Sequence, residues 1–461
     1  MKSAVLLAAG EGKRAWPFSG IRQKVTVPVA NVPMVRRLAL DLLALGVEEV
    51  VAVVGHRAEA VRACLADLDK VRFAPQPECR GTVTAALTGL AEIDADAVLV
   101  CCGDIVTSRD TLKAVIEAFD ARRAEALLLT AACPHGLTAS HTAVEAREDG
   151  LVTGIGPRGG TEHPRFGGVA AARTETLRRY LLRHPGIMPD VGVGGMPPVE
   201  GDLASCFELM RQDGIEVHAV RARDYFVDVD MPWHIVEANR QAAQHALDAL
   251  DRTVVSPGAT IHDGADIPAD AKVWLGPGAH IGKGCHIGGP VMLGPGARVV
   301  NGAIVGANVV LGEDTRCENY CDVGAGSVIG GRCVVGHCAE FSGVTFDLVY
   351  LYHYSCLTAL IGTHVDIGAA TVSGTWRFDD GVRVQAIQGR KVVPECHGSY
   401  TFIGDYCRTG VNAVFMPGVK VGYYSCVGPG AIIYEDVAER TVLLAKQEHV
   451  TKPWGPEKYD W

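Results

Sequence analysis

The sequence predicts an α/β domain followed by a parallel β-helix, and two observations lead to this fold class. Apolar runs typical of buried strands alternate with helical patterns in the first half, whereas aliphatic residues recur every six positions in the second half. Of the 461 residues, 48% are hydrophobic and 21% are charged, so the chain can bury sizeable cores. The 54 glycines crowd after residue 255, which marks a domain boundary.

The first half alternates strand and helix patterns. The expected strands are 3–9, 48–54, 70–74 and 97–102, and the expected helices are 33–45, 56–66, 82–91 and 109–121. This alternation indicates a parallel sheet that helices cover on both faces. A further helical pattern at 232–250 bridges the two halves. We therefore expect an N-terminal domain at 1–231, a linker helix at 232–252, a β-helix domain at 253–440 and a C-terminal tail at 441–461.

A six-residue repeat defines the second half. Aliphatic residues fall at Val255, Ile261, Ile267 and Val273, and the register then slips by two residues. The next twelve positions are all hydrophobic, where the 48% composition predicts about six by chance: Leu275, Ile281, Ile287, Leu293, Val299, Val305, Leu311, Cys317, Val323, Ile329, Val335 and Phe341. A period of six fits a triangular solenoid with one inward side chain per face. The period breaks at Asp347 and returns from Ile361 to Ile433, with an extended loop expected at 375–400.

Composition also argues against some classes of protein. The net charge of −10 disfavours a general nucleic-acid or membrane-surface binder. The 15 cysteines follow no paired metal-binding spacing, and we interpret them as reduced thiols that pack as small apolar groups. No apolar run reaches membrane-spanning length and the first residues are too short for a signal peptide, so we expect a cytoplasmic protein.

A Gly-rich turn, Gly10 to Arg14, follows the first expected strand. Glycines in such a turn let backbone N–H groups point at an anion and let the anion approach closely. The spacing is not that of a P-loop, and Ala15 stands where a dinucleotide-binding turn would place its last glycine. The turn alone therefore indicates a phosphate site without naming the ligand.

Three further motifs follow the turn in order over some 230 residues, and the set resembles the nucleotide-sugar pyrophosphorylases, which are sugar-1-phosphate nucleotidylyltransferases with a Rossmann-like fold. The LAAGEGKR segment is followed by QKVTVPV and VPM at 23–34, and then by Gln76 with Gly81-Thr82. Gly103-Asp104 follows the strand at 97–102, and FVDVD at 226–230 precedes Pro232. The resemblance implies attack of a sugar-phosphate oxygen on the α-phosphorus of a nucleoside triphosphate, with release of pyrophosphate.

The resemblance also implies a role for each motif residue. Arg14 would bind the triphosphate, Lys24 would neutralise charge near the α-phosphate, and Asp104 and Asp228 would share a Mg²⁺ ion, which prefers carboxylate oxygens. Gln76 would read the base edge, and its amide suits a pyrimidine, so UTP is the expected nucleotide. The residues assigned to nucleotide binding are Leu7, Ala8, Ala9, Gly10, Gly12, Gln76, Gly81, Thr82 and Gly103.

Two carboxylates have a second interpretation. Asp104 follows a strand and could be a helix N-cap, although we favour the metal ligand. Asp230 is either a second metal ligand or the N-cap of the helix that begins at Pro232, and here we favour the cap.

On the sugar side the chain departs from the family pattern. Phe166-Gly167-Gly168-Val169 matches a family motif, and Gly168 is assigned to sugar binding, but Phe166 replaces the asparagine that contacts the sugar. Residues 154–158 lack the expected Glu-Lys pair. Lys13, which replaces a hydroxyl residue in the turn, is the one departure that does not lie on the sugar side. These departures predict an intact nucleotide side and an unusual sugar.

The second half resembles the β-helix of bifunctional, archaeal-type N-acetylglucosamine-1-phosphate uridylyltransferases, which is left-handed, trimeric and binds acetyl-CoA between subunits. YHYS at 352–355 matches the motif that contains the family's general base, and this makes His353 the candidate base for an N-acyl transfer. By the same resemblance, Ala369, Ala370, Arg408 and Asn412 belong to the acyl-CoA site. Thr375 and Asp366 replace asparagines of the family.

Two alternatives remain open from the sequence. The β-helix could be only an oligomerisation scaffold, with His353 in a structural role; His337 and His364 are expected to be structural in either case. The whole chain could also be a catalytically silent regulatory or assembly subunit of the same fold. Because Arg14, Lys24 and the pair of Asp104 and Asp228 are all present, we favour an enzyme that acts on a nucleoside triphosphate and a sugar-1-phosphate.

Overall fold

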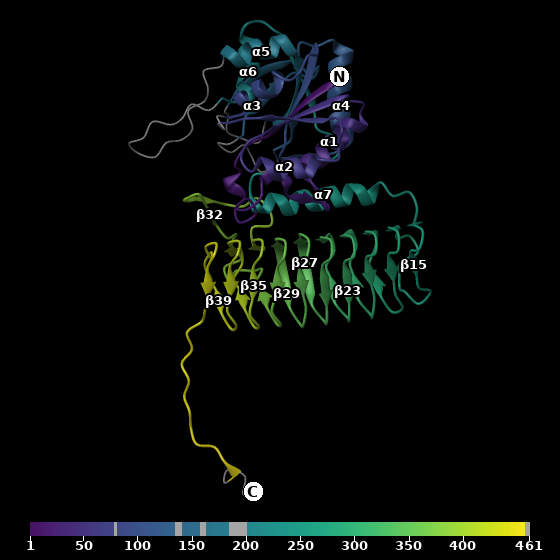
Figure 1. The fold of residues 1–461 in the computed structure, drawn as a ribbon, viewed down its shortest axis with the longest axis vertical. Coiled ribbons are helices and arrows are strands. Elements are labelled where there is room, and N and C mark those ends of the chain that lie inside the picture. Colours follow the sequence, from purple (N-terminus) through teal and green to yellow (C-terminus); the bar gives the residue numbers. More distant parts are fainter. Residues whose placement is uncertain (78–80, 134–140, 157–162, 184–200, 457–461) are drawn as a thin grey trace.

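A computed structural model describes residues 1–77, 81–133, 141–156, 163–183 and 201–456, and it shows an α/β domain stacked on a solenoid of short strands (Figure 1). Helix α7 (Pro232–Asp248) lies between the two parts and runs along the solenoid. No helix in these ranges combines the length and the apolar character that a bilayer crossing needs.

The central sheet of the N-terminal domain has the order β10-β9-β11-β6-β1-β4-β5, and β8 pairs with β11 and β12. The expected strands are confirmed, and β6, β1, β4 and β5 run parallel. Later strands make the sheet mixed, because β11 runs antiparallel to both β6 and β8. The strands are β1 (Ser3–Ala8), β4 (Glu49–Val54), β5 (Val71–Pro75), β6 (Ala97–Cys102), β8 (Ala126–Ala131), β9 (Ala143–Ala146), β10 (Val152–Gly156), β11 (Arg165–Arg173) and β12 (Val217–Arg221).

Helices cover both faces of this sheet, as the alternating pattern predicts. Alternate residues of β1 point to opposite faces, so that Leu6 packs in one core with α1, α2 and α4, and Val5 packs in another with α3, α5 and α6. The helices are α1 (Met34–Ala44), α2 (Ala58–Leu65), α3 (Gly81–Leu90), α4 (Arg109–Arg122), α5 (Thr174–Arg183) and α6 (Leu203–Gln212). The shorter elements are η1 (Lys13–Ala15), η2 (Lys24–Thr26), β2 (Pro28–Val29), β3 (Val32–Pro33), β7 (Ile105–Thr107) and β13 (Phe226–Asp228).

The second half is a three-faced parallel β-helix, and its six-residue repeat is confirmed. All twelve positions from Leu275 to Phe341 are at most 1% exposed and share one continuous core. Strands on one face pair with strands one coil away, as in the step of eighteen residues from Leu275 to Leu293. Val255, by contrast, is 49% exposed, because it lies in the first coil at the end of the stack.

The three faces carry the following strands. The face next to α7 contains β14 (Val254–Val255), β16 (Val273–Leu275), β19 (Val291–Leu293), β22 (Val309–Leu311), β25 (Val328–Ile329), β34 (Thr401–Ile403) and β37 (Lys420–Val421). The second contains β15 (Thr260–Ile261), β17 (His280–Ile281), β20 (Arg298–Val299), β23 (Arg316–Glu318), β26 (Val334–Gly336), β28 (Tyr350–Leu351), β30 (Asp366–Ile367), β35 (Arg408–Thr409), β38 (Cys426–Val427) and β40 (Val442–Leu443). The third contains β18 (His286–Ile287), β21 (Ile304–Val305), β24 (Asp322–Val323), β31 (Val372–Ser373), β36 (Val414–Phe415) and β39 (Ile432–Ile433).

The break in the repeat at Asp347 is a shortening of the coil. Phe341 pairs with Leu357, sixteen residues on, whereas Val323 pairs with Phe341, eighteen residues on. The two missing residues are those of a corner, so β27 (Glu340–Thr345) and β29 (Cys356–Ile361) run without a turn across two faces. In these coils the solenoid therefore has no corner between the third face and the face next to α7.

The segment 375–400 is more ordered than the extended loop that the sequence predicts. It contains an antiparallel hairpin of β32 (Gln385–Ile387) and β33 (Arg390–Val392). Gln388 and Gly389 form its two-residue turn with φ of 50° and 76°, the pair of positive values that a tight hairpin turn needs. The segment, which we call the coil insertion, extends from the solenoid towards the N-terminal domain (Figure 1).

A hydrophobic core joins the two domains. It contains residues of α7, of the segment 18–34, of the solenoid face next to α7 and of the coil insertion. Its largest members are Phe18, Met34, Trp233, Ile235, Phe346, Leu360, Ile387 and Phe402. Val328, Val344 and Leu360 point out of the solenoid, yet all three are 0% exposed because this core covers them.

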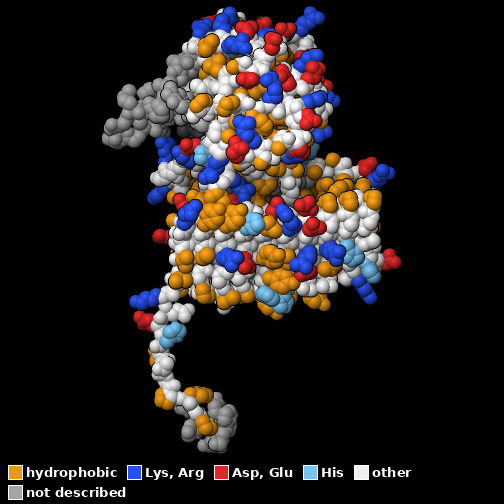
Figure 2. Space-filling model, in the orientation of Figure 1, with side chains coloured by type: hydrophobic (Ala, Val, Ile, Leu, Met, Phe, Trp, Pro, Cys, Tyr) orange, Lys and Arg blue, Asp and Glu red, His pale blue; other side chains and the backbone are white. Residues whose placement is uncertain are grey.

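The chain after β40 leaves the solenoid as an extended tail (Figures 1 and 2), in which Val450 and Trp454 are exposed. On the face shown in Figure 2, charged side chains are denser on the N-terminal domain than on the solenoid.

Truncating an outward-facing side chain of the solenoid should destabilise the protein strongly only where the interdomain core covers that side chain. Leu360→Ala should lower the free energy of unfolding by about 2–5 kcal/mol, because it leaves a cavity between the domains. Ile432→Ala is the matched control, since Ile432 is 54% exposed, and it should change stability by no more than about 0.5 kcal/mol. Chemical unfolding measures both values, and equal effects would contradict the interdomain core.

Candidate active site

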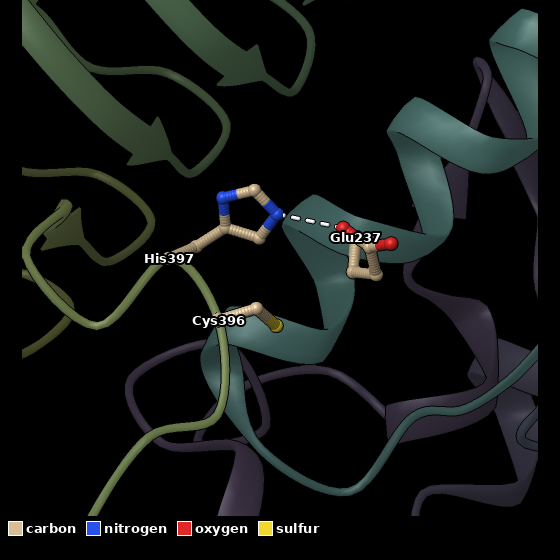
Figure 3. A group of neighbouring side chains, drawn as sticks. All are labelled: Glu237, Cys396 and His397. Carbon is tan, nitrogen blue, oxygen red and sulfur yellow. Dashed lines mark hydrogen bonds and ion pairs between the residues drawn. The ribbon is translucent and has the colours of Figure 1, made fainter. Parts of the chain in front are cut away.

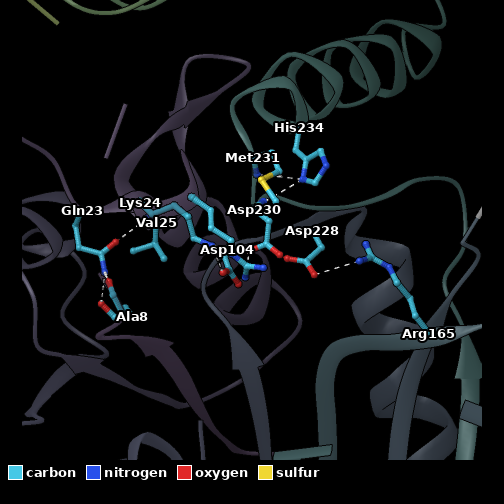
Figure 4. A network of polar contacts seen from close by, with 12 residues as sticks. Ala8, Gln23, Lys24, Val25, Asp104, Arg165, Asp228, Asp230, Met231 and His234 are labelled. Atoms are coloured by element: carbon cyan, nitrogen blue, oxygen red, sulfur yellow. Dashed lines mark hydrogen bonds and ion pairs between the residues drawn. The ribbon is translucent and has the colours of Figure 1, made fainter. Parts of the chain in front are cut away.

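The Gly-rich turn lies at the carboxyl end of β1 and is held by the buried side chain of Gln23. The Gln23 amide nitrogen donates to the carbonyl oxygens of Ala8 (2.9 Å) and Gly10 (2.6 Å), and its amide oxygen accepts from the N–H of Val25 (2.7 Å) (Figure 4). Two of these bonds reach the turn and the third reaches the residue after Lys24, so Gln23 ties the turn to the lysine segment. This role was not assigned from the sequence.

Gly12 allows Lys24 to lie against the turn. Its φ is +64°, and a Cβ there would lie 2.5 Å from the Cβ of Lys24. Any side chain at position 12 would therefore push the lysine away, and this close approach explains the second glycine of the turn.

Three carboxylates meet beside this turn. Asp104 follows β6, and β13 pairs with β7 so that Asp228 lies opposite Ile105. Asp230 follows two residues after Asp228, and one oxygen from each of the three carboxylates lies within 4.8 Å of the others. The pairing of two short strands thus brings together residues that are more than 120 positions apart in the sequence.

Two cations neutralise this cluster. The Nζ of Lys24 lies 2.6 Å from Asp104 Oδ2 and 3.2 Å from Asp230 Oδ1, and Nη2 of Arg14 lies 2.9 Å from Asp230 Oδ1. Burial opposes the charge on Lys24, but the carboxylates of Asp104, Asp230 and Asp228 raise its pKa above the usual value. Burial likewise opposes the charge on Asp230, yet Lys24 and Arg14 hold the pKa of Asp230 down to about 2.

The preferred interpretation of Asp230 as a helix cap is wrong. The N-cap of α7 is Met231, and the side chain of Asp230 points at Lys24 and Arg14 instead of the helix N–H groups. Asp104 is not a cap either, because α4 begins at Arg109 and Ser108 caps it. Both carboxylates belong to the cluster.

Arg165 is a cluster residue that sequence reasoning missed. It begins β11, is 9% exposed, and places Nη1 3.2 Å from Asp228 Oδ2 (Figure 4). Its guanidinium also lies 5.0 Å from the ring centre of Phe226. Burial, Asp230 and Asp104 together raise the pKa of Asp228 to about 6, against the opposing effect of Arg165. Arg165 directly precedes the Phe166 motif, so its position next to a strand with family-like residues was the available signal.

A cavity of about 590 Å³ lies over the turn and the cluster. Ten of the residues assigned from the sequence line it: Leu7, Ala9, Gly10, Gly12, Arg14, Lys24, Gln76, Gly81, Thr82 and Asp104. Ala8 and Gly103 lie behind its wall, where the Ala8 carbonyl binds Gln23 and the Gly103 N–H donates to Leu7. The hydroxyl of Thr82 already accepts from the Leu203 N–H (2.8 Å) and contacts the Gly201 carbonyl (3.3 Å), so it supports the wall.

A smaller cavity of about 190 Å³ adjoins the first and shares Arg14, Thr82, Asp104 and Asp230 with it. Asp228, Phe166, Gly168 and His141 also line this second cavity. Gly168 has φ of +66° at an irregularity of β11, and a Cβ there would lie 2.9 Å from Ile105. The cluster therefore stands at the junction of a large and a small cavity, an arrangement that suits two substrates. Residues 157–158 of the departing segment lie outside the described ranges.

Gln388 at the tip of the coil insertion also lines the larger cavity. Through Gln388, the solenoid half of the chain forms part of the wall of this cavity in the N-terminal domain. Nothing in the local sequence around Gln388 predicts this.

On the solenoid, His353 lies at an exposed corner with φ of 53°. Its Nδ1 is in hydrogen-bond contact with Nδ1 of His337, and its ring centre lies 4.6 Å from that of His337 and 4.8 Å from that of Tyr352. Since two imidazole nitrogens share one hydrogen, one ring donates and the other accepts. His337, assigned to a structural role, therefore directly contacts the candidate base.

The other residues assigned to the acyl-CoA site lie near this corner in later coils. The Ala370 N–H donates to the His353 carbonyl (2.8 Å), and the Asn412 N–H donates to the Ala369 carbonyl (2.8 Å), so these residues stack at one corner. Arg408 lies on the adjoining face and lines a cavity of about 550 Å³ with Tyr350 and Tyr406.

Comparisons with known proteins agree with this layout. Residues 4–159 match the family model of the MobA-like NTP transferase domain. The chain is 25% identical over 456 residues to the bifunctional protein GlmU of Methanococcus maripaludis, covering 97% of this chain and 98% of the relative. It is 23% identical over 456 residues to the bifunctional sugar-1-phosphate nucleotidylyltransferase/acetyltransferase of Sulfurisphaera tokodaii, covering 94% and 98%.

A third relative matches over a shorter stretch. The bifunctional protein GlmU of Marinobacter nauticus is 36% identical over 153 residues, which are 33% of this chain and 32% of the relative. The chain therefore joins an NTP transferase domain to a β-helix and resembles, over nearly its whole length, the bifunctional sugar-1-phosphate nucleotidylyltransferase/acetyltransferase proteins.

Proposed function

We propose that the protein transfers a nucleotidyl group from a nucleoside triphosphate, with UTP preferred, to a sugar-1-phosphate and releases pyrophosphate. The observation that carries this proposal is the cluster of Asp104, Asp228 and Asp230 with Lys24 and Arg14 at the junction of the two cavities. The larger cavity would take the nucleotide and the smaller one the sugar phosphate.

The chain's residues suit the charge that this reaction develops. A phosphate oxygen of the sugar attacks the α-phosphorus, a new P–O bond forms, and the bond to the leaving pyrophosphate breaks. Arg14 and the N–H groups of the Gly-rich turn would hold the β- and γ-phosphates, and Lys24 would face the α-phosphate. Because Lys24 is only 10% exposed and fixed by two carboxylates, its charge is in place before the reaction begins.

The carboxylates also fit a hard divalent cation. Oxygens from Asp104, Asp228 and Asp230 lie close enough to share one ion, and oxygen is the donor that Mg²⁺ prefers. Bound Mg²⁺ would supply further neutralisation of the triphosphate charge. Arg165 would hold the orientation of Asp228 through its 3.2 Å contact.

Gln76 supports the choice of a pyrimidine nucleotide. Its side chain is buried in the wall of the larger cavity, and its amide nitrogen donates to Thr84 Oγ1 at 2.8 Å. The bond fixes the amide plane, so that the side chain presents one defined orientation to a base edge.

The proposal predicts which change abolishes pyrophosphate release. Asp104→Asn should lower kcat at least about 100-fold, because it removes a carboxylate from the cluster and leaves Lys24 with one partner fewer. A panel of nucleoside triphosphates crossed with sugar-1-phosphates, with Mg²⁺ present, measures pyrophosphate release. No release by the wild-type protein with any pair would favour the alternative of a silent regulatory subunit.

We further propose a second activity in the β-helix, an N-acyl transfer from acetyl-CoA to an amino-sugar phosphate. One of the relatives bears the name of an acetyltransferase, and His353 lies exposed with His337 against it. His353 would take a proton from the sugar amine while His337 holds its ring. A homotrimer would complete this site between subunits. The exposed aromatic residues Tyr350 and Tyr354 near the corner support such an assembly.

We also propose a cytoplasmic location. The fourteen cysteines in the described ranges are all free thiols, and several of them, such as Cys285 and Cys317, pack inside the solenoid. Unpaired thiols in this number suit a reducing compartment.

The acyl transfer predicts a selective loss. His353→Ala should lower thiol release from acetyl-CoA with amino-sugar phosphates by about 100-fold or more, since a general base contributes about 10²–10⁴-fold. Pyrophosphate release by the same variant should not change. If the wild-type protein releases no thiol with any amino-sugar phosphate, the β-helix is an oligomerisation scaffold.

A further inference from the structure

Glu395 of the coil insertion contacts the first turn of α7. Its Oε2 accepts from the indole N–H of the buried Trp233 at 3.0 Å, and its Oε1 lies 2.5 Å from Nε2 of His234. The negative charge suits both donors. Burial opposes this charge, but the hydrogen bonds from His234 and Trp233, among other contacts, lower the pKa of Glu395 to about 2. One carboxylate thus binds two neighbouring residues of the helix across the domain interface.

His234 links Glu395 to the backbone of Asp230 in the carboxylate cluster. Its Nδ1 accepts from the backbone N–H of Asp230 at 3.1 Å and of Met231 at 3.3 Å (Figure 4). Because both partners are donors, Nδ1 has to carry the lone pair, so the ring hydrogen is on Nε2 and is donated to Glu395. Glu395 therefore fixes the tautomer and the ring orientation that Asp230 requires.

We infer that Glu395 and His234 are positioning residues for nucleotidyl transfer, and that the coil insertion of the β-helix completes the N-terminal active site by holding Asp230 in place. The inference rests on the proposed function. The peptide of Asp230 is held from one side by His234, while its carboxylate contacts Lys24 and Arg14 on the other. Hydrogen bonds of this kind, made to the residues behind a site, orient the groups that act on substrate or metal.

A second pair of residues provides a matched control. His397 of the coil insertion lies 2.7 Å from Glu237 of α7, with Cys396 close by (Figure 3). Like Glu395 and His234, this pair joins the coil insertion to α7 through a carboxylate and an imidazole. Glu237 is nearly one helical turn beyond His234, and none of the hydrogen bonds of the pair reaches Asp230.

The kinetic experiment compares the two pairs in the full-length protein. His234→Ala and Glu395→Ala should each lower kcat for pyrophosphate release by about 10–100-fold, with KM for the nucleoside triphosphate changed by less than about threefold. His397→Ala and Glu237→Gln should leave kcat within about twofold of wild type. His234→Asn should recover most of the activity lost in His234→Ala, since its amide oxygen can accept from the Asp230 N–H.

A binding experiment separates this inference from the proposed function. Mn²⁺, used as a probe and followed by electron paramagnetic resonance, should bind wild-type protein and bind His234→Ala about tenfold more weakly, with His397→Ala unchanged. If wild-type protein binds Mn²⁺ in this pattern but releases no pyrophosphate, the proposed function fails and the positioning role stands.

Three results would overturn the inference. In the first, His397→Ala lowers kcat and Mn²⁺ affinity as much as His234→Ala does, so that any loss of interdomain contact has the same effect. In the second, His234→Ala changes only the melting temperature, as the loss of a helix cap would. In the third, wild-type protein binds no Mn²⁺.

Discussion

Like charges repel at short range, and three carboxylates that meet within 4.8 Å have to be compensated. Lys24 lies between Asp104 and Asp230, Arg14 contacts Asp230 from the turn, and Arg165 contacts Asp228 from the far side. Much of the local structure serves this compensation. Gln23 fixes the lysine segment to the turn. The pairing of β13 with β7 brings Asp228 and Asp230 next to Asp104. The result is a site where charge is balanced by fixed groups before any substrate arrives.

The cluster adjoins the contacts that join the two domains. Helix α7 begins at Pro232, two residues after Asp230, and its apolar residues pack against the solenoid where two shortened coils lack a corner. The coil insertion extends from that side, placing Gln388 at the larger cavity and Glu395 at the first turn of α7. The β-helix thus contributes to the N-terminal site through contacts, besides any activity at His353.

Regular features of the chain could be predicted from the sequence, because a repeat records which side chains point inward. The inward positions from Leu275 to Phe341 follow from the repeat alone, and the convergence of Asp104 with Asp228 was implied by the family resemblance. Contacts between segments that lie far apart in the sequence produce no comparable pattern. Glu395 has an ordinary local sequence, and the signal for Arg165 was only its place before the Phe166 motif. Asp230 resembled a cap because it stands before a helix-starting proline. The sequence shows the break in the repeat at Asp347. Only the pairing of strands sixteen residues apart shows that the break is a shortened coil.

Exchange of labelled pyrophosphate into the nucleoside triphosphate tests the central claim most directly, because it follows the reaction in reverse. With Mg²⁺, label should enter the triphosphate only when the matching nucleotide sugar is present, since the sugar phosphate attacks the α-phosphorus directly, in a single displacement. Exchange with the triphosphate and pyrophosphate alone, or no exchange with any nucleotide sugar, would contradict the account.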